Sequence, residues 1–187
     1  MNLVFLPATE PNDPTFGSSP DRINGRPDLR IHAVRFPHLV WYNAQVRREA
    51  AAQIEALGAE RVVLFGFSKS GLGAWNLARE LPHRIGATVL FDAPVARREL
   101  PNWGTAPFYF GDEAWRTDLP IENLEAFRTA VSLTHRLILI SGANFHTEMV
   151  ELSEALKRAR TAHTFLPRPD LKHHWDSGWI DLALREL

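Results

Sequence analysis

A serine in a glycine-rich turn is the first candidate for chemistry. Ser68 lies in the segment Gly66-Phe67-Ser68-Lys69-Ser70-Gly71, directly after the apolar run 61–65. The segment begins like the pattern G-x-S-x-G, in which a strand turns sharply into a helix and exposes the serine hydroxyl as a nucleophile. Ser70 replaces the second glycine, and its side chain is small enough for this departure to be mild. In the alternative interpretation, the turn is only tight and Ser68 or Ser70 caps the following helix.

The same turn lacks the residues of two phosphate-binding motifs. A P-loop needs a lysine and a hydroxyl residue after its second glycine, whereas Leu72-Gly73 follow Gly71. The dinucleotide pattern G-x-G-x-x-G is also absent from this turn. A helix N-terminus can bind phosphate without either motif, and Lys69 would favour that. A flavodoxin-like phosphate- or nucleotide-binding protein therefore remains an alternative.

Two adjacent histidines are the candidate bases. They stand in Lys172-His173-His174-Trp175-Asp176-Ser177-Gly178-Trp179. Serine hydrolases whose nucleophile lies in a strand–helix turn place the histidine last in the chain, after the acid. The neighbouring tryptophans would exclude water, which strengthens electrostatic interactions in a site. The alternative is a surface pair beside a tryptophan that anchors the last helix. No spaced partner of the H-E-x-x-H type is present, so we expect neither a metal nor a cofactor.

Short apolar runs alternate with helical patterns along the chain. We expect strands at 3–6, 29–34, 61–65, 87–91, 137–140 and 164–166, and helices at 43–57, 74–80, 121–131, 147–160 and 179–187. This alternation predicts an α/β fold, a three-layer α/β/α sandwich with a mostly parallel sheet of roughly six strands. Ligands of such sheets bind outside the carboxyl ends of the strands, where the serine turn and the histidine loop would both lie.

Composition limits the classes of function. The 187 residues suit one domain, 1–187. The formal net charge of -1 gives no electrostatic case for nucleic acid or an anionic membrane. The absence of cysteine excludes a thiol nucleophile and disulfides. No apolar stretch approaches the ~18 residues of a membrane span, and the first residues predict a strand, not a signal peptide. We therefore expect a cytoplasmic protein.

Together these segments resemble the α/β-hydrolase superfamily, in particular its small esterase-like members. The resemblance covers nearly the whole chain and is strongest at 66–71, at Phe91-Asp92-Ala93-Pro94 and at 173–179. It implies a serine hydrolase in which Ser68 attacks a small acyl substrate and a histidine acts as the base. Esterases of this superfamily often carry a tryptophan two positions after that histidine, which favours His173 over His174.

The resemblance leaves the acid of the site open. The superfamily usually places it after the penultimate strand, but Ser141-Gly142-Ala143-Asn144-Phe145-His146 contains no carboxylate. Asp92, which ends the preceding strand, is the first choice and Glu148 the second, while Asn144 would orient the base without a charge. A purely structural role for Asp92 in the turn before Pro94 is equally open.

The resemblance also assigns an oxyanion hole, which we expect to be formed by the backbone N–H of Lys69 with that of Ala8 or Thr9. Lys69 could attract an anionic substrate, or it could point to solvent as most lysines do.

Several segments could shape a substrate pocket. The aromatic-rich segment at about 95–132 falls where these hydrolases insert a cap, and the loop 9–27 could cover the site. Phe67, Trp175 and Trp103 are candidates for lining the pocket, although the aromatic residues of the 95–132 segment could equally be core. Because the usual acid is missing, a catalytically inactive binding protein of the same fold remains an alternative. An exposed sheet edge could also pair in a homodimer.

Overall fold

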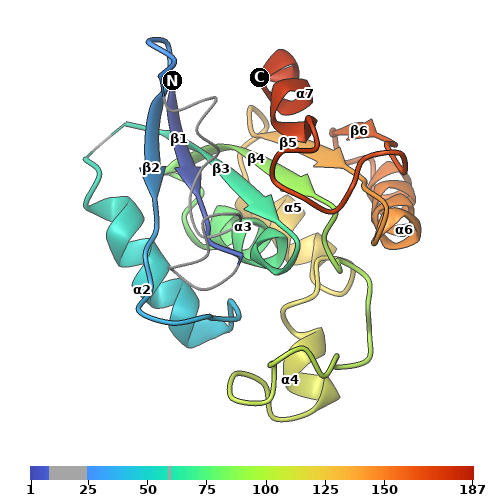
Figure 1. The fold of residues 1–187 in the computed structure, drawn as a ribbon. Helices are drawn as coiled ribbons and strands as arrows, with labels where there is room; N and C mark the ends of the chain where they lie inside the picture. Colours follow the sequence, from blue (N-terminus) through green and yellow to red (C-terminus); the bar gives the residue numbers. More distant parts are fainter. Residues whose placement is uncertain (9–24, 59) are drawn as a thin grey trace.

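The computed structural model describes residues 1–8, 25–58 and 60–187. Within this part of the chain, one sheet of six strands forms the centre of the molecule (Figure 1). The strands are β1 (Asn2–Phe5), β2 (Arg30–Ala33), β3 (Val62–Phe67), β4 (Ile85–Phe91), β5 (Arg136–Ile140) and β6 (Thr164–Leu166). Their order is β2-β1-β3-β4-β5-β6, and all neighbours are parallel. The predicted parallel α/β sheet is confirmed.

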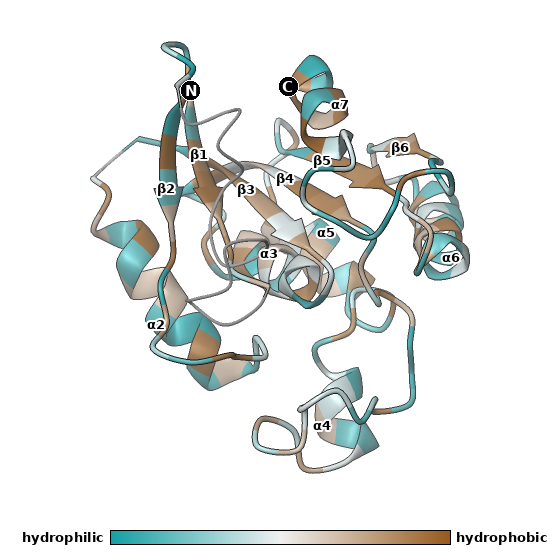
Figure 2. Ribbon diagram, in the orientation of Figure 1, coloured by the Kyte–Doolittle hydropathy of each residue, from teal (hydrophilic) through white to brown (hydrophobic). Residues whose placement is uncertain are grey.

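The central strands are apolar on both faces. In β3 every residue is buried, and successive side chains point to opposite faces of a strand. Val62 and Leu64 belong to one core cluster, whereas Val63, Phe65 and Phe67 belong to another. The continuous apolar runs therefore reflect a sheet that is covered on both sides, as the brown strands of Figure 2 show.

Helices cover the two faces unequally. Helices α2 (Ala44–Glu55), α3 (Lys69–Glu80), α5 (Leu124–Ala130) and α6 (His146–Arg158) contribute to the first core cluster. Helix α7 (Trp179–Glu186) packs against the second cluster with Trp179, Ile180 and Ala183. The three layers of the predicted sandwich are therefore present. None of the helices in the described ranges is long and apolar enough to cross a membrane.

The turn after β3 is shorter than expected. The sequence predicts a turn over 66–73 and a helix from Ala74, but β3 continues to Phe67 and α3 begins at Lys69. Only Ser68 separates the two elements. The glycines that suggested a long turn serve close packing instead, since a Cβ on Gly71 would lie 2.6 Å from the Cβ of Ala93.

Two other helices differ from expectation. The sequence predicts a helix over 147–160 with Thr147 as its cap, but α6 begins at His146 with Phe145 at the N-cap position. Helix α4 (Asp112–Arg116) is not predicted, because its five residues are too few for a periodic pattern. It lies in the segment between β4 and α5, which projects from the body of the protein (Figure 1).

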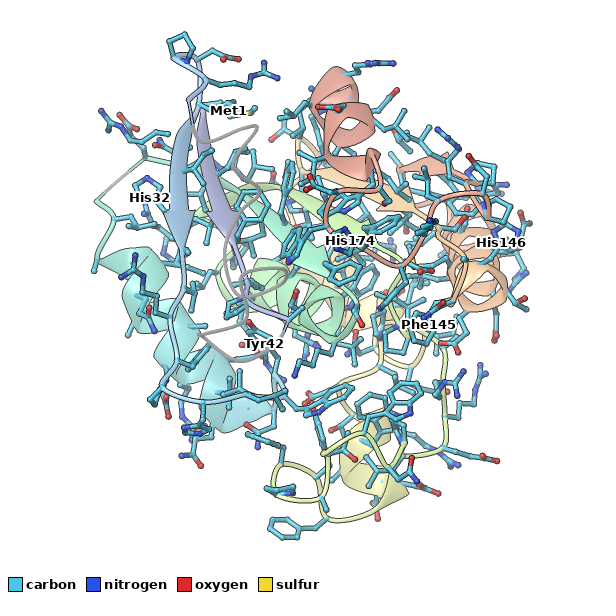
Figure 3. The ribbon with its side chains drawn as sticks, viewed as in Figure 1. Met1, His32, Tyr42, Phe145, His146 and His174 are labelled. Atoms are coloured by element: carbon cyan, nitrogen blue, oxygen red, sulfur yellow. The ribbon has the colours of Figure 1, made fainter. Side chains whose placement is uncertain are left out.

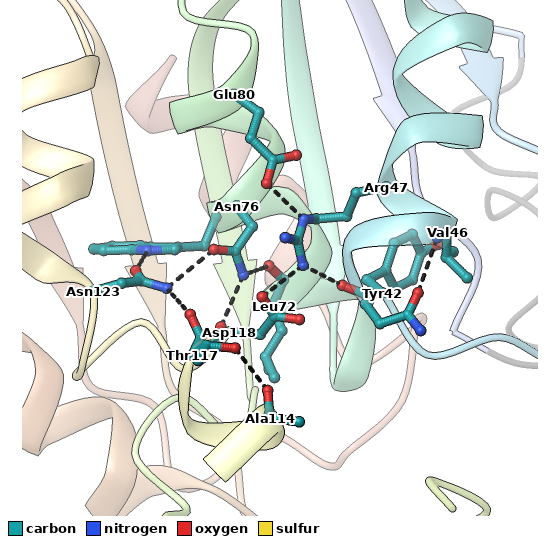
Figure 4. A network of polar contacts seen from close by, with 12 residues as sticks. Tyr42, Val46, Arg47, Leu72, Asn76, Glu80, Ala114, Thr117, Asp118 and Asn123 are labelled. Carbon is teal, nitrogen blue, oxygen red and sulfur yellow. Dashed lines mark hydrogen bonds and ion pairs between the residues drawn. The ribbon is translucent and has the colours of Figure 1, made fainter. Parts of the chain in front are cut away.

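A buried polar network joins this projecting segment to the helices (Figure 4). The side chain of Arg47 is 4% exposed and forms ion pairs of 2.8 Å with Glu80 and with Asp118. The hydroxyl of Tyr109 donates to Asp118 at 3.1 Å, and burial together with the Asp118 charge raises the pKa of Tyr109. An unpaired buried charge is costly, so these contacts hold Asp118 against α2 and α3. Whether the segment 95–132 is a cap in the functional sense stays a prediction.

Candidate active site

Ser68 stands alone between β3 and α3 in a strained conformation. Its backbone angles are φ 53° and ψ −128°, a region that residues with a side chain rarely adopt and that costs about 1–3 kcal/mol. Gly66 allows the turn, because a Cβ there would lie 2.6 Å from the carbonyl oxygen of Ser70. The Ser70 hydroxyl closes the turn: it accepts from the N–H of Phe67 and donates to its carbonyl, at 2.9 Å each. Ser68 itself is partly exposed.

Asp92 ends the neighbouring strand β4 at the same edge of the sheet. The N–H of Ser68 donates to the carbonyl of Phe91 at 3.0 Å, so the two strand ends are joined by the backbone. Like Ser68, Asp92 has a positive φ, 43°. Its side chain is fully buried, which would be unfavourable for a charge without partners.

His173 is the partner of Asp92. It lies in the loop between β6 and α7, and its Nδ1 is 2.7 Å from Oδ2 of Asp92. A carboxylate can only accept, so Nδ1 carries the proton and Nε2 is left as the basic nitrogen. The imidazole packs against the ring of Phe67, with ring centroids 4.5 Å apart. Since Phe67 immediately precedes Ser68, the histidine lies over the end of β3.

The loop between β5 and α6 wraps around the Asp92 carboxylate. Oδ1 accepts the N–H groups of Gly142 and Phe145 at 3.0 and 2.8 Å, and Oδ2 accepts that of Asn144 at 3.1 Å. Burial raises the pKa of Asp92, but the hydrogen bonds from His173 and from this backbone outweigh it and hold the pKa below its ordinary value of 3.8. The loop that carries no acid of its own thus binds the acid of the neighbouring strand.

The other candidates for base and acid lie elsewhere. Nδ1 of His174 accepts the N–H of Asp176 at 3.0 Å, and His174 lines a separate surface hollow of about 270 Å³ that does not include His173. Glu148 is paired with Arg97 at 2.9 Å, and burial raises its pKa despite this partner. The structure therefore brings Asp92 to His173, and it brings neither Glu148 nor His174 into that pair.

The pocket candidates divide into buried and exposed residues. Phe67 and Trp175 are each 2% exposed and pack against each other within the core, with ring centroids 5.4 Å apart. Of the two, Phe67 packs directly against His173. Trp103 is 44% exposed and packs against Phe145, with centroids 5.9 Å apart. Phe145 in turn contacts the imidazole of His173, at 5.6 Å between centroids.

The expected oxyanion-hole residues are only partly described. Lys69 is the first residue of α3 and Ala8 is a buried residue just after β1. Thr9 and most of the loop 9–27 lie outside the described residues. Lys69 is only 7% exposed, and its Nζ lies 5.5 Å from the ring centroid of Trp41. The solvent-facing alternative for Lys69 is therefore wrong.

Three residues near the site are not expected from the sequence: Trp41, Arg97 and Phe145. None belongs to a motif. Phe145 carries a weak signal, because it follows the fifth strand at the edge where ligands bind. Trp41 and Arg97 reach the site only through the tertiary structure.

The chain resembles known proteins in structure and not in sequence. No family profile matches the chain, and no curated protein has a matching sequence. Many solved structures are similar. A capsule O-acetyltransferase of Neisseria meningitidis serogroup A matches with a TM-score of 0.64 and 11% identity, over 99% of this chain and 86% of that one. An S-formylglutathione hydrolase from Agrobacterium tumefaciens matches with a TM-score of 0.62 and 15% identity, over 99% and 82%.

A third similar structure is much larger. Dipeptidyl peptidase 4 of Porphyromonas gingivalis matches 99% of this chain with a TM-score of 0.61 and 15% identity, but the chain spans only 30% of that enzyme. At such identities the likeness concerns the fold. The similar structures share one architecture, and their parallel sheet with its flanking helices is the one described above. The chain is therefore a protein of the α/β-hydrolase fold.

Proposed function

We propose that the protein is a serine hydrolase that cleaves a small ester, with Ser68 as nucleophile, His173 as base and Asp92 as the acid that orients the base. One observation carries the proposal: the 2.7 Å hydrogen bond between His173 and the buried Asp92, at the sheet edge where strained Ser68 stands. The turn around Ser68 has the strand–serine–helix arrangement of a nucleophile elbow. The hydrolase fold supports the same class of reaction.

The proposed reaction begins with attack of Ser68 Oγ on the ester carbonyl carbon. Nε2 of His173 takes the hydroxyl proton, and the tetrahedral intermediate collapses when the alcohol leaves with that proton. Water then attacks the acyl-enzyme with His173 again as base, which releases the carboxylic acid and restores Ser68. Ester and water are consumed, and acid and alcohol are formed.

The negative charge of the intermediate needs donors at the opposite side of Ser68. The backbone N–H of Lys69, at the first position of α3, and that of Ala8 are the proposed pair. Donors of this kind typically contribute ~10²–10³ in kcat each. The partial positive charge at the N-terminus of α3 acts in the same direction.

Asp92 has two tasks in this proposal. It keeps the proton of His173 on Nδ1, so that Nε2 faces the nucleophile, and it stabilises the imidazolium that forms during each step. Both require an ionised carboxylate. The lowered pKa of Asp92 supports that state near neutral pH.

The two alternative functions, phosphate binding and binding without catalysis, account for fewer of the observed features of the site. Flavodoxin-like sheets share the strand order 2-1-3-4-5 with this one, so topology does not separate the phosphate-binding alternative. Phosphate binding has no use for a buried carboxylate–imidazole pair, however. An inactive binding protein of this fold has no need for a strained Ser68. Transfer of an acyl group to an acceptor other than water, as in the name of the meningococcal acetyltransferase, would use the same residues.

Labelling with a fluorophosphonate probe tests the proposal. We expect wild-type protein to be labelled, Ser68→Ala to be unlabelled, and Ser132→Ala, a change at an exposed turn residue, to be labelled normally. Ser70→Ala should keep a reactive serine even if it loosens the turn. His173→Ala should slow labelling, whereas His174→Ala should not. Folded wild-type protein that resists the probe would instead favour the inactive binding protein.

A further inference from the structure

Three aromatic side chains form a continuous strip beside the proposed site. Trp41, Trp103 and Phe145, here called the aromatic strip, contact one another in that order, with ring centroids 6.4 and 5.9 Å apart. The indole N–H of Trp41 donates to the backbone carbonyl of Trp103 at 3.2 Å, which holds the backbone that carries the exposed tryptophan. Figure 3 shows Phe145 between the sheet and the segment that carries α4.

Both ends of the aromatic strip reach the catalytic residues proposed above. At one end Phe145 contacts the His173 imidazole at 5.6 Å between centroids. At the other end the Nζ of Lys69, the residue after Ser68, lies 5.5 Å from the centroid of Trp41. Trp103 is 44% exposed, whereas Trp41 and Phe145 are only 3% and 7% exposed, so a flat apolar group would bind mainly against Trp103, between these two ends.

A cation lies over the same aromatic surface. The guanidinium carbon of Arg97 is 5.0 Å from the ring centroid of Trp103 and 5.7 Å from that of Phe145. The side chain is 40% exposed, so it can be reached from solvent. Arginine over an aromatic face is a recurrent arrangement for binding flat anions, because the guanidinium stacks and donates in one plane.

The guanidinium of Arg97 forms fewer hydrogen bonds within the described part of the protein than its donors allow. Its Nε and Nη2 both donate to the same oxygen of Glu148, at 3.0 and 2.9 Å. This pair is not a fork in which each nitrogen has its own oxygen. No contact of Nη1 is found within the described residues. The guanidinium thus keeps donors for a second carboxylate.

We propose that the aromatic strip and Arg97 bind the alcohol part of the substrate, and that this part is a flat apolar group ending in a carboxylate. The inference rests on the proposed hydrolase function and names its substrate class, an anionic aryl ester. The exposed part of Trp103 would contact the ring, Arg97 would bind the carboxylate, and the ester bond would face Ser68. Arg97 is then the residue that determines specificity.

The matched esters 4-acetoxybenzoate and methyl 4-acetoxybenzoate test this. One carries a carboxylate where the other carries a methyl ester, and hydrolysis of the acetyl ester, followed by the release of acetate, yields the corresponding phenol from either compound. Because a hydrogen bond to a charged group contributes roughly ten- to hundredfold in affinity, we expect Arg97→Met to lower the ratio of kcat/KM for the acid over that for the methyl ester by about tenfold or more.

Arg98→Met is the matched control. Arg98 is similarly exposed, and it is bound to Glu122, Glu151 and the Ala96 carbonyl. We expect the wild-type ratio in this variant. An equal fall in both variants would overturn the proposal, because it would reflect total charge and not a site.

Glu148 supplies a readout of opposite sign. If Arg97 served only to neutralise Glu148, Glu148→Gln would leave the ratio of kcat/KM for the acid over the methyl ester unchanged. In that case Arg97 would have no contact with the substrate, and the variant would remove only the charge that Arg97 neutralises. In our proposal Glu148→Gln removes the competing carboxylate, and the preference for the acid rises. The double variant Arg97→Met/Glu148→Gln restores charge balance inside the protein but should still lack the preference. Recovery of the preference in the double variant would overturn the assignment of Arg97.

Failure of this inference can be distinguished from failure of the proposed function. If the probe labels Ser68 but Arg97→Met leaves the ratio unchanged, the hydrolase stands and the substrate class is wrong. If neither labelling nor ester hydrolysis occurs, the binding of 4-hydroxybenzoate can still be measured through the quenching of tryptophan fluorescence. Saturable quenching that is lost in Arg97→Met would then support the anion site, and its absence would overturn it.

Discussion

His173 and Asp92 are 81 positions apart in the chain and 2.7 Å apart in space. The same Asp92 carboxylate also binds three backbone N–H groups between Gly142 and Phe145. One buried side chain thus joins the end of β4, the start of α6 and the loop before α7. Its geometric role in the fold and its proposed role in catalysis are carried by the same two oxygens.

Replacing the carboxylate of Asp92 by an amide should separate these roles in part. Asp92→Asn keeps the size of the side chain but removes the charge, and its amide can hold His173 in the wrong tautomer. We expect the rate of fluorophosphonate labelling to fall by about 10³- to 10⁴-fold, with the fold retained. Asp92→Ala should also lower stability by about 3–5 kcal/mol, because three backbone donors lose their acceptor. Labelling kinetics and urea unfolding check the pair, and wild-type labelling in Asp92→Asn would contradict the assigned acid.

Gly142 provides a steric test of the same contact. A Cβ at this position would lie 2.5 Å from Cγ of Asp92, so Gly142→Ala must displace the carboxylate from His173. We expect loss of labelling together with about 1–3 kcal/mol of destabilisation from overpacking. Gly86→Ala is the control, since its Cβ would meet nothing nearer than 3.6 Å. Normal labelling in Gly142→Ala would show that the displaced contact does not matter for reactivity.

His135 should make the protein less stable in mild acid. Burial, aided by the Arg61 charge, lowers the pKa of His135 from 6.5 to about 4 against the opposing effect of the Ile85 carbonyl. Between these values the unfolded chain binds the proton and the folded protein does not, so the free energy of unfolding falls as pH falls from 6.5 to 4. The loss is at most about 3 kcal/mol. Urea unfolding across this range should show a weaker pH dependence in His135→Phe and an unchanged one in His38→Gln, a change at an exposed histidine.

The sequence predicts the layers and strands well because they depend on local patterns. After Arg61, the predicted strand 61–65 is apolar throughout, and a strand covered on both faces fits such a run best. The start of α3 is different: glycines at 66, 71 and 73 suggest a flexible turn, yet they lie where other atoms approach too closely for a Cβ. The sequence shows that a glycine is present, but it does not show whether the glycine provides a flexible turn or allows close packing.

The site is predictable only where a motif marks it. Ser68 and the histidine pair stand in recognisable segments, whereas the choice of Asp92 over Glu148 depends on which carboxylate the fold brings to His173. The aromatic strip as a unit has no sequence signal, although Trp103 is a pocket candidate and Phe145 follows the fifth strand. Trp41, Trp103 and Phe145 come from three separate segments, and their contacts exist only after the sheet and the projecting segment have packed.

Glycine in place of the strained serine should stabilise the protein. Ser68 has φ 53° and ψ −128°, a conformation that glycine adopts without steric cost. We expect Ser68→Gly to raise the free energy of unfolding by about 1 kcal/mol or more, while Ser132→Gly, at an exposed turn, should not raise it. Thermal unfolding of the two variants decides the matter, and a destabilised Ser68→Gly would mean that the serine side chain has a structural partner.

That strain has an evolutionary consequence. If stability alone were selected, glycine would be favoured at position 68, because it is the one residue that adopts this backbone conformation without steric cost. A lineage that had lost its need for the hydroxyl would drift toward the relaxed backbone within the reach of single nucleotide changes, since serine and glycine codons can be neighbours. A serine held in this conformation is therefore a test of the proposed function, because relatives that have lost the activity are expected to carry glycine at this position more often than relatives that have kept it.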